Sequence, residues 1–522
     1  MGRSPVRPAG IIDHGIDKGG EDRGCRTWSE NADSAAALRK APLQCFPGCQ
    51  PGSGCLCCKT CHTPCTLPES AMTLNRRQLL VGASSSILGA SMLSAGSAKA
   101  TTAITAAGAQ AGSTSTGTAG GSTRPDTTPF SPDYQTARGK FLAAAAAAGA
   151  HVEHHRLPGF DGPDGKPLYM DSARIGPQDA DVVVVSVCGT HGAEGFCGSA
   201  AQIDWLSHEA PRKALPKGVA ALLVHAVNPW GFAHMLRTNE NKVNINRNSI
   251  DFASPPPVNP LFREIFTTFP TRMGHDEDLV AEFNAAYVAA EEKYGRWEVS
   301  DALGRGQYQE PDGYEYGGTR SEWSSRTLFE IMRKQCAGAR HVAYVDWHTL
   351  INIGDGKLVF LCFNQTGDPL FERAGTWWGR EAIDREAVNK QWSQGTTNRR
   401  PSRAGILMWG VQQAMAPQAD VAGAVIEFCA DPDTFILSPE EGQRGWVYSR
   451  WLRHTRDYAS PTGKFIAAYL REGTSPTRRS FQEAALGAAR ETYHRTLQGA
   501  ARWAEENVQA VPGKLVHYSA FD

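Results

Sequence analysis

The residues of this sequence that are best suited to chemistry are a His and a Glu that follow a run of valines. The segment Val182–Val187 has strand character, and the Gly-rich turn after it carries His191 and Glu194, three positions apart. A neutral imidazole nitrogen and a carboxylate oxygen are ligands that a catalytic zinc ion favours, and such a site usually adds a third protein ligand and a water. If this pair binds metal, a third ligand, a general base and an anion-binding Arg should lie elsewhere in the chain.

These residues must be positioned by an alternation of apolar strand-like runs and helical patterns. The runs are apolar on both faces, which is typical of strands in a sheet covered by helices on both sides. The expected strands are Val182–Val187, Ala221–Val227, Val342–Val345, Leu358–Phe363 and Val421–Phe428. The expected helices are Gly198–His208, Asp278–Tyr294, Ser324–Cys336, Gly375–Asn389 and Ser480–Glu506. The pattern predicts one large α/β domain with a mixed, mainly parallel sheet flanked by helices.

Several of the predicted strands end next to polar groups that could take part in catalysis. Asn228 follows the second strand, His348 follows the third, and the last strand runs into Glu427. Ligands of open α/β sheets bind outside the carboxyl ends of the strands, so these groups should meet at one edge. Taken singly, each has a plainer interpretation. His348 could be a core histidine with satisfied hydrogen bonds, and Glu427 could belong to a structural ion pair, because a buried carboxylate needs a partner or a function.

An Arg- and Asn-rich segment after Asn228 supplies candidates for binding an anion. Arg237 begins it, and Asn246 and Arg247 lie near its end. Arg suits fork-like recognition of a carboxylate and stabilisation of an oxyanion. A solvated surface loop is the alternative interpretation of this segment.

Taken in order, these motifs resemble the carboxypeptidase A-type zinc peptidase superfamily, and in particular an uncharacterised bacterial branch of it. The resemblance covers roughly residues 130–520. Its motifs lie at Gly189–Phe196, Asn228–Phe232, Val243–Asn248, Gly306–Tyr308, Tyr316–Gly318 and Asp346–Thr349.

The resemblance implies a role for each candidate residue. His191, Glu194 and His348 would bind a single zinc ion, and Glu427 would be the general base that activates the zinc-bound water. Arg237 would polarise the carbonyl or hold substrate. Asn246 and Arg247 would bind the substrate's terminal carboxylate. Tyr314 and Tyr316 are candidates for a substrate-capping Tyr, with packing as the alternative, and Asp346 could orient His348 or make an ordinary core hydrogen bond.

The expected activity is zinc-dependent, carboxypeptidase-like hydrolysis of a peptide bond. One alternative is deacylation of N-acyl amino acids, as in the related aspartoacylases and succinylglutamate desuccinylases. A second is a non-catalytic binding protein with the same fold. Cysteine chemistry at Cys188 or Cys197 is disfavoured because exported thiols tend to oxidise. A serine-hydrolase mechanism lacks its Gly-x-Ser-x-Gly motif.

Overall charge is nearly balanced, with 53 Lys and Arg against 54 Asp and Glu, which argues against nucleic-acid or membrane-surface binding. Eight of the 13 cysteines precede residue 70, in a region without periodic apolar residues. We expect residues 1–71 to be a disordered, non-native upstream extension rather than a zinc knuckle or disulfide knot, with Met72 as the true start.

Residues 72–100 have the features of a signal peptide. The pair Arg76 and Arg77 precedes an apolar stretch and a small-residue cleavage site, which is typical of twin-arginine export. Residues 101–129 read as a low-complexity linker, and 130–522 as the catalytic domain. The expected partners are therefore the twin-arginine export machinery and a peptide or N-acyl amino acid substrate. The expected location is the periplasm or the medium, with no stable membrane span once the signal is removed.

Overall fold

The structure, a computed structural model, describes residues 127–208, 215–351, 354–364, 367–383, 402–430 and 439–506. These residues all belong to one compact unit. The predicted upstream extension and signal peptide, and nearly all of the predicted linker, lie outside the described residues. Among the described helices, none is both long and apolar enough to cross a bilayer.

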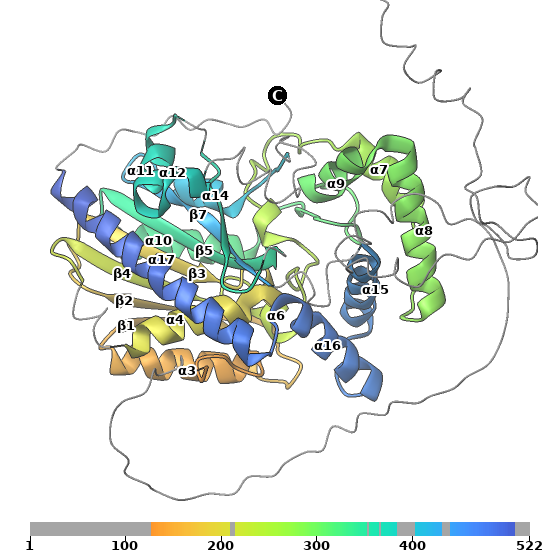
Figure 1. Ribbon diagram of the computed structural model, residues 1–522, viewed down its shortest axis with the longest axis horizontal. Coiled ribbons are helices and arrows are strands. Elements are labelled where there is room, and N and C mark those ends of the chain that lie inside the picture. The colour runs from red at the N-terminus through yellow and green to blue at the C-terminus, as the bar shows by residue number, and fades with distance from the viewer. Residues whose placement is uncertain are drawn as a thin grey trace, which may run out of the picture. The chain divides into compact units, whose positions relative to one another are not determined.

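A seven-stranded sheet forms the centre of the described part, in the order β1-β2-β4-β3-β5-β7-β6 (Figure 1). The strands are β1 His151–Asp161, β2 Pro167–Ile175, β3 Val182–Cys188, β4 Val219–His225, β5 His341–Ile351, β6 Leu358–Leu361 and β7 Asp420–Cys429. The four central strands, β4, β3, β5 and β7, pair in parallel. The two edge strands, β1 and β6, and the strand β2 next to β1 pair antiparallel with their neighbours. The predicted mixed α/β fold is therefore confirmed, with its parallel part at the centre.

Helices cover both faces of the sheet and extend beyond one end of it (Figure 1). The helices are α3 Tyr134–Ala147, α4 Gly195–Ser207, α6 Pro229–Ala233, α7 Pro260–Phe266, α8 Glu277–Tyr294, α9 Arg296–Arg305, α10 Trp323–Gln335, α11 Pro369–Trp378, α12 Arg380–Ile383, α14 Leu407–Met415, α15 Pro439–Thr455, α16 Pro461–Thr474 and α17 Arg479–Glu505. Two short 3-10 turns, η3 Gly192–Glu194 and η4 Ile245–Arg247, follow β3 and α6. In the described part of the expected helix Gly375–Asn389, Gly379 separates α11 from α12, and residues 384–389 lie outside the described residues.

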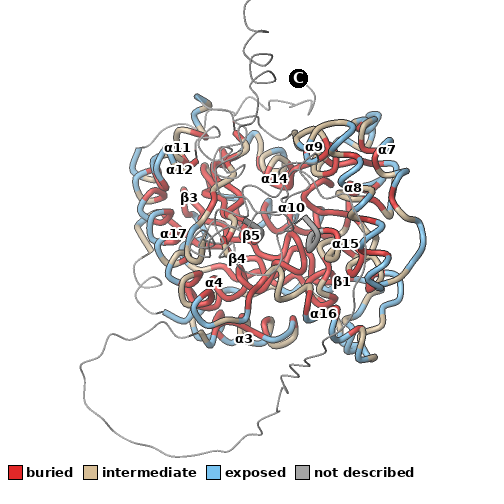
Figure 2. The backbone as a smooth tube through the Cα atoms, turned by 45° about the vertical axis from the view of Figure 1, so that its right-hand side comes forward, coloured by how far each residue is buried: buried red, intermediate tan, exposed pale blue. Residues whose placement is uncertain are grey.

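Alternate side chains of the central strands enter two separate cores. On one face, Val345, Trp347 and Ile426 pack in a cluster that includes residues of α4 and α17. On the other, Val187 and Tyr344 pack in a cluster with residues of α10 and α14. Because both faces are covered, the strands need apolar residues at successive positions, which explains their unbroken Val-rich runs. Buried backbone accordingly runs through the sheet and the inward sides of the helices (Figure 2).

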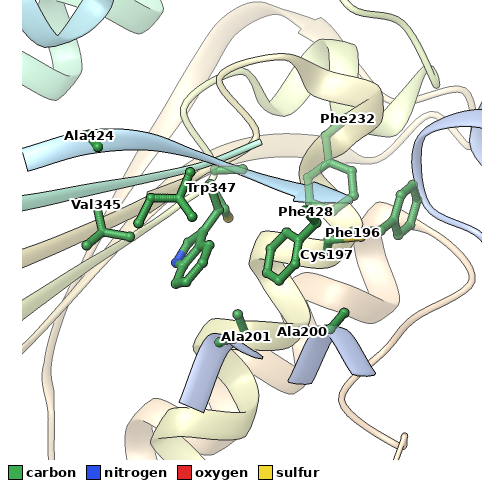
Figure 3. Packing of buried hydrophobic residues seen from close by; sticks show 14 of the residues in the cluster. Phe196, Cys197, Ala200, Ala201, Phe232, Val345, Trp347, Ala424 and Phe428 are labelled. Carbon is green, nitrogen blue, oxygen red and sulfur yellow. The ribbon is translucent and has the colours of Figure 1, made fainter. Parts of the chain in front are cut away.

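Trp347 shows how tightly the first of these cores is fixed next to the carboxyl end of the sheet. Its ring stacks on Phe428 of the neighbouring strand, with centroids 5.0 Å apart (Figure 3). Its indole nitrogen donates to Ser186 Oγ at 3.0 Å. Side chains alternate along a strand, so anchoring Trp347 and Phe428 on one face sends their neighbours His348 and Glu427 to the other. The core packing therefore sets the direction of two predicted site residues.

Candidate metal centre

The predicted ligands His191, Glu194 and His348 lie together at the carboxyl end of the sheet. One donor atom from each falls within 4.8 Å of the others, and all three residues are buried. His191 Nδ1 lies 3.1 Å from Glu194 Oε1 and 3.1 Å from His348 Nδ1. His348 Nδ1 lies 3.3 Å from Glu194 Oε2. The donor set therefore has the composition and compactness of a zinc site with an open position.

The turn between β3 and α4 places two of these donors. After Cys188 the chain turns at Gly189, whose φ of +69° favours glycine, and a Cβ there would lie 2.9 Å from Ala226 Cβ. His191 then caps η3, and Glu194 both ends η3 and precedes α4. The third donor, His348, comes from β5, which pairs with β3. Neighbouring parallel strands thus bring together ligands that lie more than a hundred residues apart in the sequence.

The outward nitrogen of each His ring faces an acceptor. His191 Nε2 lies 3.0 Å from Asn244 Oδ1, and His348 Nε2 lies 3.1 Å from Asp346 Oδ1, although the latter contact lacks hydrogen-bond geometry. Asp346 is itself held by Thr190 Oγ1, which donates to Oδ1 at 2.9 Å. Metal-binding histidines usually have such a partner on the ring nitrogen that points away from the metal, because it fixes the tautomer. The side chains around the cluster therefore fit a zinc ion bound through the two Nδ1 atoms and Glu194.

Electrostatics at the cluster favour a positive charge between its donors. Burial alone would lower the pKa of His348, but Asp346 and Glu194 outweigh it and hold that pKa well above its ordinary value. Burial lowers the pKa of His191 to about 4, which keeps this imidazole neutral, as a metal ligand must be. Although burial would raise the pKa of Glu194, His191 and Arg237 hold it well below its usual range. Glu194 is therefore a carboxylate.

The predicted general base, Glu427, lies beside the third ligand. In the parallel pairing of β5 and β7, Glu427 is directly opposite His348, so the two side chains share a face of the sheet. Glu427 Oε2 is buried and has no hydrogen-bond partner within the described part of the chain. Burial is the main reason that its pKa rises to about 7. A carboxylate with an unpaired oxygen next to the three predicted ligands is available to accept a proton.

Arg237 reaches the cluster from the segment after α6. Its Nη1 donates to Glu194 Oε1 at 2.6 Å, and its side chain keeps 38 % of its surface exposed. A backbone hydrogen bond holds this segment against η3, because Ala193 N donates to Leu236 O at 3.0 Å. The geometry thus places a guanidinium that still faces solvent next to a predicted ligand.

Asn246 and Arg247 lie in η4 and are both buried, with partners inside the protein. Asn246 Oδ1 accepts from Leu407 N at 2.9 Å. Arg247 donates to the carbonyls of Asn246 and Gly304, each at 2.7 Å. Their predicted contact with a substrate carboxylate therefore stays a prediction, and as they stand both side chains serve the packing of the loop.

Two residues of this region were absent from the predicted site, Asn244 and Glu315. Asn244 lies between His191 and Glu315. Its Oδ1 contacts His191 Nε2, and its Nδ2 donates to Glu315 Oε2. Glu315 also pairs with Arg237 and Arg247, at 3.0 Å each. Glu315 keeps 13 % of its side chain exposed, and an acid in a loop rich in Tyr and Gly gives no sequence signal of its contacts with the arginines. No sequence signal distinguishes Asn244 from the other Asn residues of its motif.

The remaining candidates contact neighbours other than the cluster. Tyr314 stacks on Trp446, with centroids 3.7 Å apart, and its hydroxyl donates to Gln443 at 2.8 Å, which agrees with a packing role. Tyr316 is buried, and its carbonyl accepts from Asn244 N at 2.8 Å. Cys197 is buried, and burial raises the pKa of its thiol to about 11, which disfavours a thiolate nucleophile.

Comparison with known proteins gave one family and a set of distantly similar structures. Bovine thrombin-activatable fibrinolysis inhibitor, solved in complex with tick carboxypeptidase inhibitor, is 13% identical, with a TM-score of 0.34, and the match covers 65% of this chain and 96% of that chain. A metallo-carboxypeptidase from Pseudomonas aeruginosa is 14% identical, with a TM-score of 0.31 and coverage of 61% and 68%. Carboxypeptidase A from Helicoverpa armigera is 12% identical, with a TM-score of 0.32 and coverage of 66% and 74%.

No curated protein matches the sequence. One family model matches residues 130–488. This match spans most of the chain and includes every residue of the candidate site. The chain therefore belongs to the family described as "Protein of unknown function (DUF2817)", in agreement with the uncharacterised branch that its motifs predicted.

Proposed function

We propose that this protein is a zinc-dependent hydrolase that cleaves an amide bond by carboxypeptidase-like chemistry. The observation that carries the proposal is the position of Glu427, whose carboxylate lies opposite His348 on the adjacent strand and has an unpartnered buried oxygen. A purely structural metal site is closed by its four ligands and needs no free base beside it. Here three protein donors and a proton acceptor converge, which supports hydrolysis.

His191, Glu194 and His348 would hold the ion. A bound zinc ion supplies Lewis-acid polarisation of a carbonyl and makes water a nucleophile at neutral pH. Glu427 would take the proton from the attacking water and return it to the leaving amine. Arg237, which still faces solvent next to Glu194, would donate to the oxygen of the scissile carbonyl as it becomes negative.

The test is metal analysis of the purified full chain, followed by hydrolysis of a library that contains N-acyl amino acids and peptides with both free and amidated C-termini. We expect a single zinc ion per chain and cleavage of an amide in at least one of the two classes. Cleavage of N-acyl amino acids alone would support the deacylase alternative, which uses the same metal site. A folded protein that contains no zinc and cleaves neither class would refute the proposal.

Two substitutions separate the base from the rest of the site. Glu427→Gln should keep zinc bound and lower kcat by at least about 100-fold, because the amide cannot accept the proton. Glu282→Gln makes the same chemical change on α8, where Glu282 pairs with Arg272 in an exposed contact, and should leave kcat unchanged. Turnover retained in Glu427→Gln would exclude Glu427 as the base.

A further inference from the structure

Glu315 lies between two arginines, Arg237 and Arg247, beside the predicted metal site. Arg237 Nε donates to Glu315 Oε1 at 3.0 Å, and Arg247 Nη2 lies 3.0 Å from Glu315 Oε2. Asn244 Nδ2 donates to the same Oε2, and the other end of this amide contacts the ligand His191. One carboxylate of the protein thus already binds the two guanidinium groups that could bind a carboxylate of the substrate.

Arg247 is poorly accessible to a substrate, because even its Nε, which has no hydrogen-bond partner among the described residues, is buried. Only 5 % of its side chain is exposed, and its two terminal nitrogens already donate to the carbonyls of Asn246 and Gly304 as well as facing Glu315. The loop also holds the backbone of Arg247, because Tyr308 donates from its hydroxyl to the Arg247 carbonyl at 2.8 Å. A substrate carboxylate would have to displace Glu315 to reach this guanidinium.

A third arginine, Arg403, does not provide a separate cationic site for a substrate carboxylate. Arg403 is near enough to Arg247 and Glu315 for their charges to shift its pKa, and burial is the main reason that this pKa falls to about 9. Asp301 lies 4.0 Å from Arg403 and 2.5 Å from Arg305. These arginines therefore already face carboxylates of the protein, and a substrate carboxylate would have to compete with the negative charge of Glu315 for Arg237 and Arg247.

We propose that Glu315 is a specificity-determining residue that excludes a free carboxylate from the leaving-group side of the scissile amide, so that the enzyme acts on amides whose leaving amine carries an uncharged group. This inference rests on the proposed amide hydrolysis and narrows its substrate class. It disfavours both peptides cut at their free C-terminus and N-acyl amino acids, since both carry a carboxylate next to the leaving nitrogen. Specificity of this kind comes from a repulsive group built against the wrong substrate.

The wild-type protein tests the proposal with N-acylated dipeptides that differ only in their C-terminal group, a free carboxylate or a carboxamide. We expect kcat/KM for cleavage of the central amide to be at least about tenfold higher for the carboxamide, because like charges repel at close range. Equal rates, or a preference for the free carboxylate, would overturn the role of Glu315. This comparison does not depend on any variant folding correctly.

Glu315→Gln removes the charge while keeping the shape of the side chain. We expect this variant to shift the preference toward the free carboxylate by at least about tenfold, with thermal unfolding confirming that it is folded. Glu310→Gln, the same change five positions earlier in the same loop, is the control and should keep the wild-type preference. An unchanged preference in folded Glu315→Gln would overturn the proposal.

Binding measurements separate this inference from the proposed hydrolysis. If the zinc-loaded protein cleaves neither dipeptide, the amide hydrolysis fails for this substrate pair, and calorimetric binding of both to the Glu427→Gln protein then decides the role of Glu315. Tighter binding of the carboxamide would support exclusion of the carboxylate. Equal or tighter binding of the free carboxylate, or no binding of either, would overturn it.

Discussion

Replacing Gly198 with Ala tests how strictly the packing of α4 on the sheet positions the predicted metal ligands. A Cβ at residue 198 would lie 2.7 Å from the Cβ atoms of both Cys188 and Trp347. Ordinary contact begins at 3.4 Å, so the helix and the two strands would have to separate by about 0.7 Å, the difference between 3.4 and 2.7. Both obstructing atoms are Cβ atoms, which no side-chain rotation can move, and relief therefore requires the backbone to shift.

The expected cost of this change follows from two opposed effects. Overpacking a well-filled core costs about 1–3 kcal/mol, and a contact that only the backbone can relieve should fall near the upper end. Ala is favoured over Gly in a helix by about 1 kcal/mol. The net change in Gly198→Ala should be a loss of about 2 kcal/mol in the free energy of unfolding. Because Glu194 directly precedes α4, zinc affinity should fall as well.

Urea unfolding and zinc competition against a chelator measure both effects. Gly487→Ala is the matched control, since Gly487 lies within α17 and a Cβ there would have nothing within 4 Å. This control should be stabilised by about 1 kcal/mol and should bind zinc as the wild type does. If Gly198→Ala unfolds at the same urea concentration as Gly487→Ala, the contact of α4 with β3 and β5 is not limited by the backbone and the reasoning is refuted.

Two further predictions concern the surroundings of the site. Asn244→Leu should weaken zinc binding by about 10–100-fold in chelator competition, because His191 Nε2 loses its acceptor. The control Asn241→Leu should leave zinc affinity unchanged. Equal zinc affinities of the two variants would argue against control of the His191 tautomer by Asn244. The pKa of Glu240 is raised to about 7, chiefly by burial. Its contribution to the free energy of unfolding is therefore fully present below pH 4.5 and is lost as the pH rises through 7. Glu240→Gln should therefore gain stability relative to the wild type between pH 5 and pH 8, on the order of 2 kcal/mol in urea unfolding, and a difference independent of pH would contradict this.

The central strands, and the convergence of His191, Glu194 and His348, were predictable because burial on both faces leaves a strong signal. A strand such as Val182–Cys188 has no polar face to interrupt its apolar run, and the residue after it must lie at the sheet edge. The edge strand His151–Asp161 was missed because most of its residues are polar and at least partly exposed, which is also typical of a loop. Strand β2 was missed as well, although most of its residues are buried, because Asp171, Ser172 and Arg174 interrupt its apolar residues. The edge strand β6, in contrast, was predicted from its apolar run. The sequence thus indicates the strands that are continuously apolar and gives little sign of those that contain polar residues.

The charged surroundings of the cluster could not be predicted in the same way. Glu315 and Asn244 are far apart in sequence, and their contact depends on how the loops after α6 and α9 fold against each other. Each residue taken alone is compatible with a solvated loop. Arg247 illustrates the same limit, since its sequence motif indicates an anion-binding residue while its partner in the fold is a carboxylate of the protein.

This division between strands and loops bears on how such a site can acquire its specificity. His348 and Glu427 are fixed by the register of two buried parallel strands, so a change there would disturb the core on the opposite face through Trp347 and Phe428. Glu315 lies on a loop, where a substitution alters the charge that a substrate meets without moving the strands. Reaction chemistry and substrate choice are therefore set by separable parts of the chain. Glu427→Gln should accordingly abolish turnover without changing which peptide binds, while Glu315→Gln should change which peptide binds without abolishing turnover.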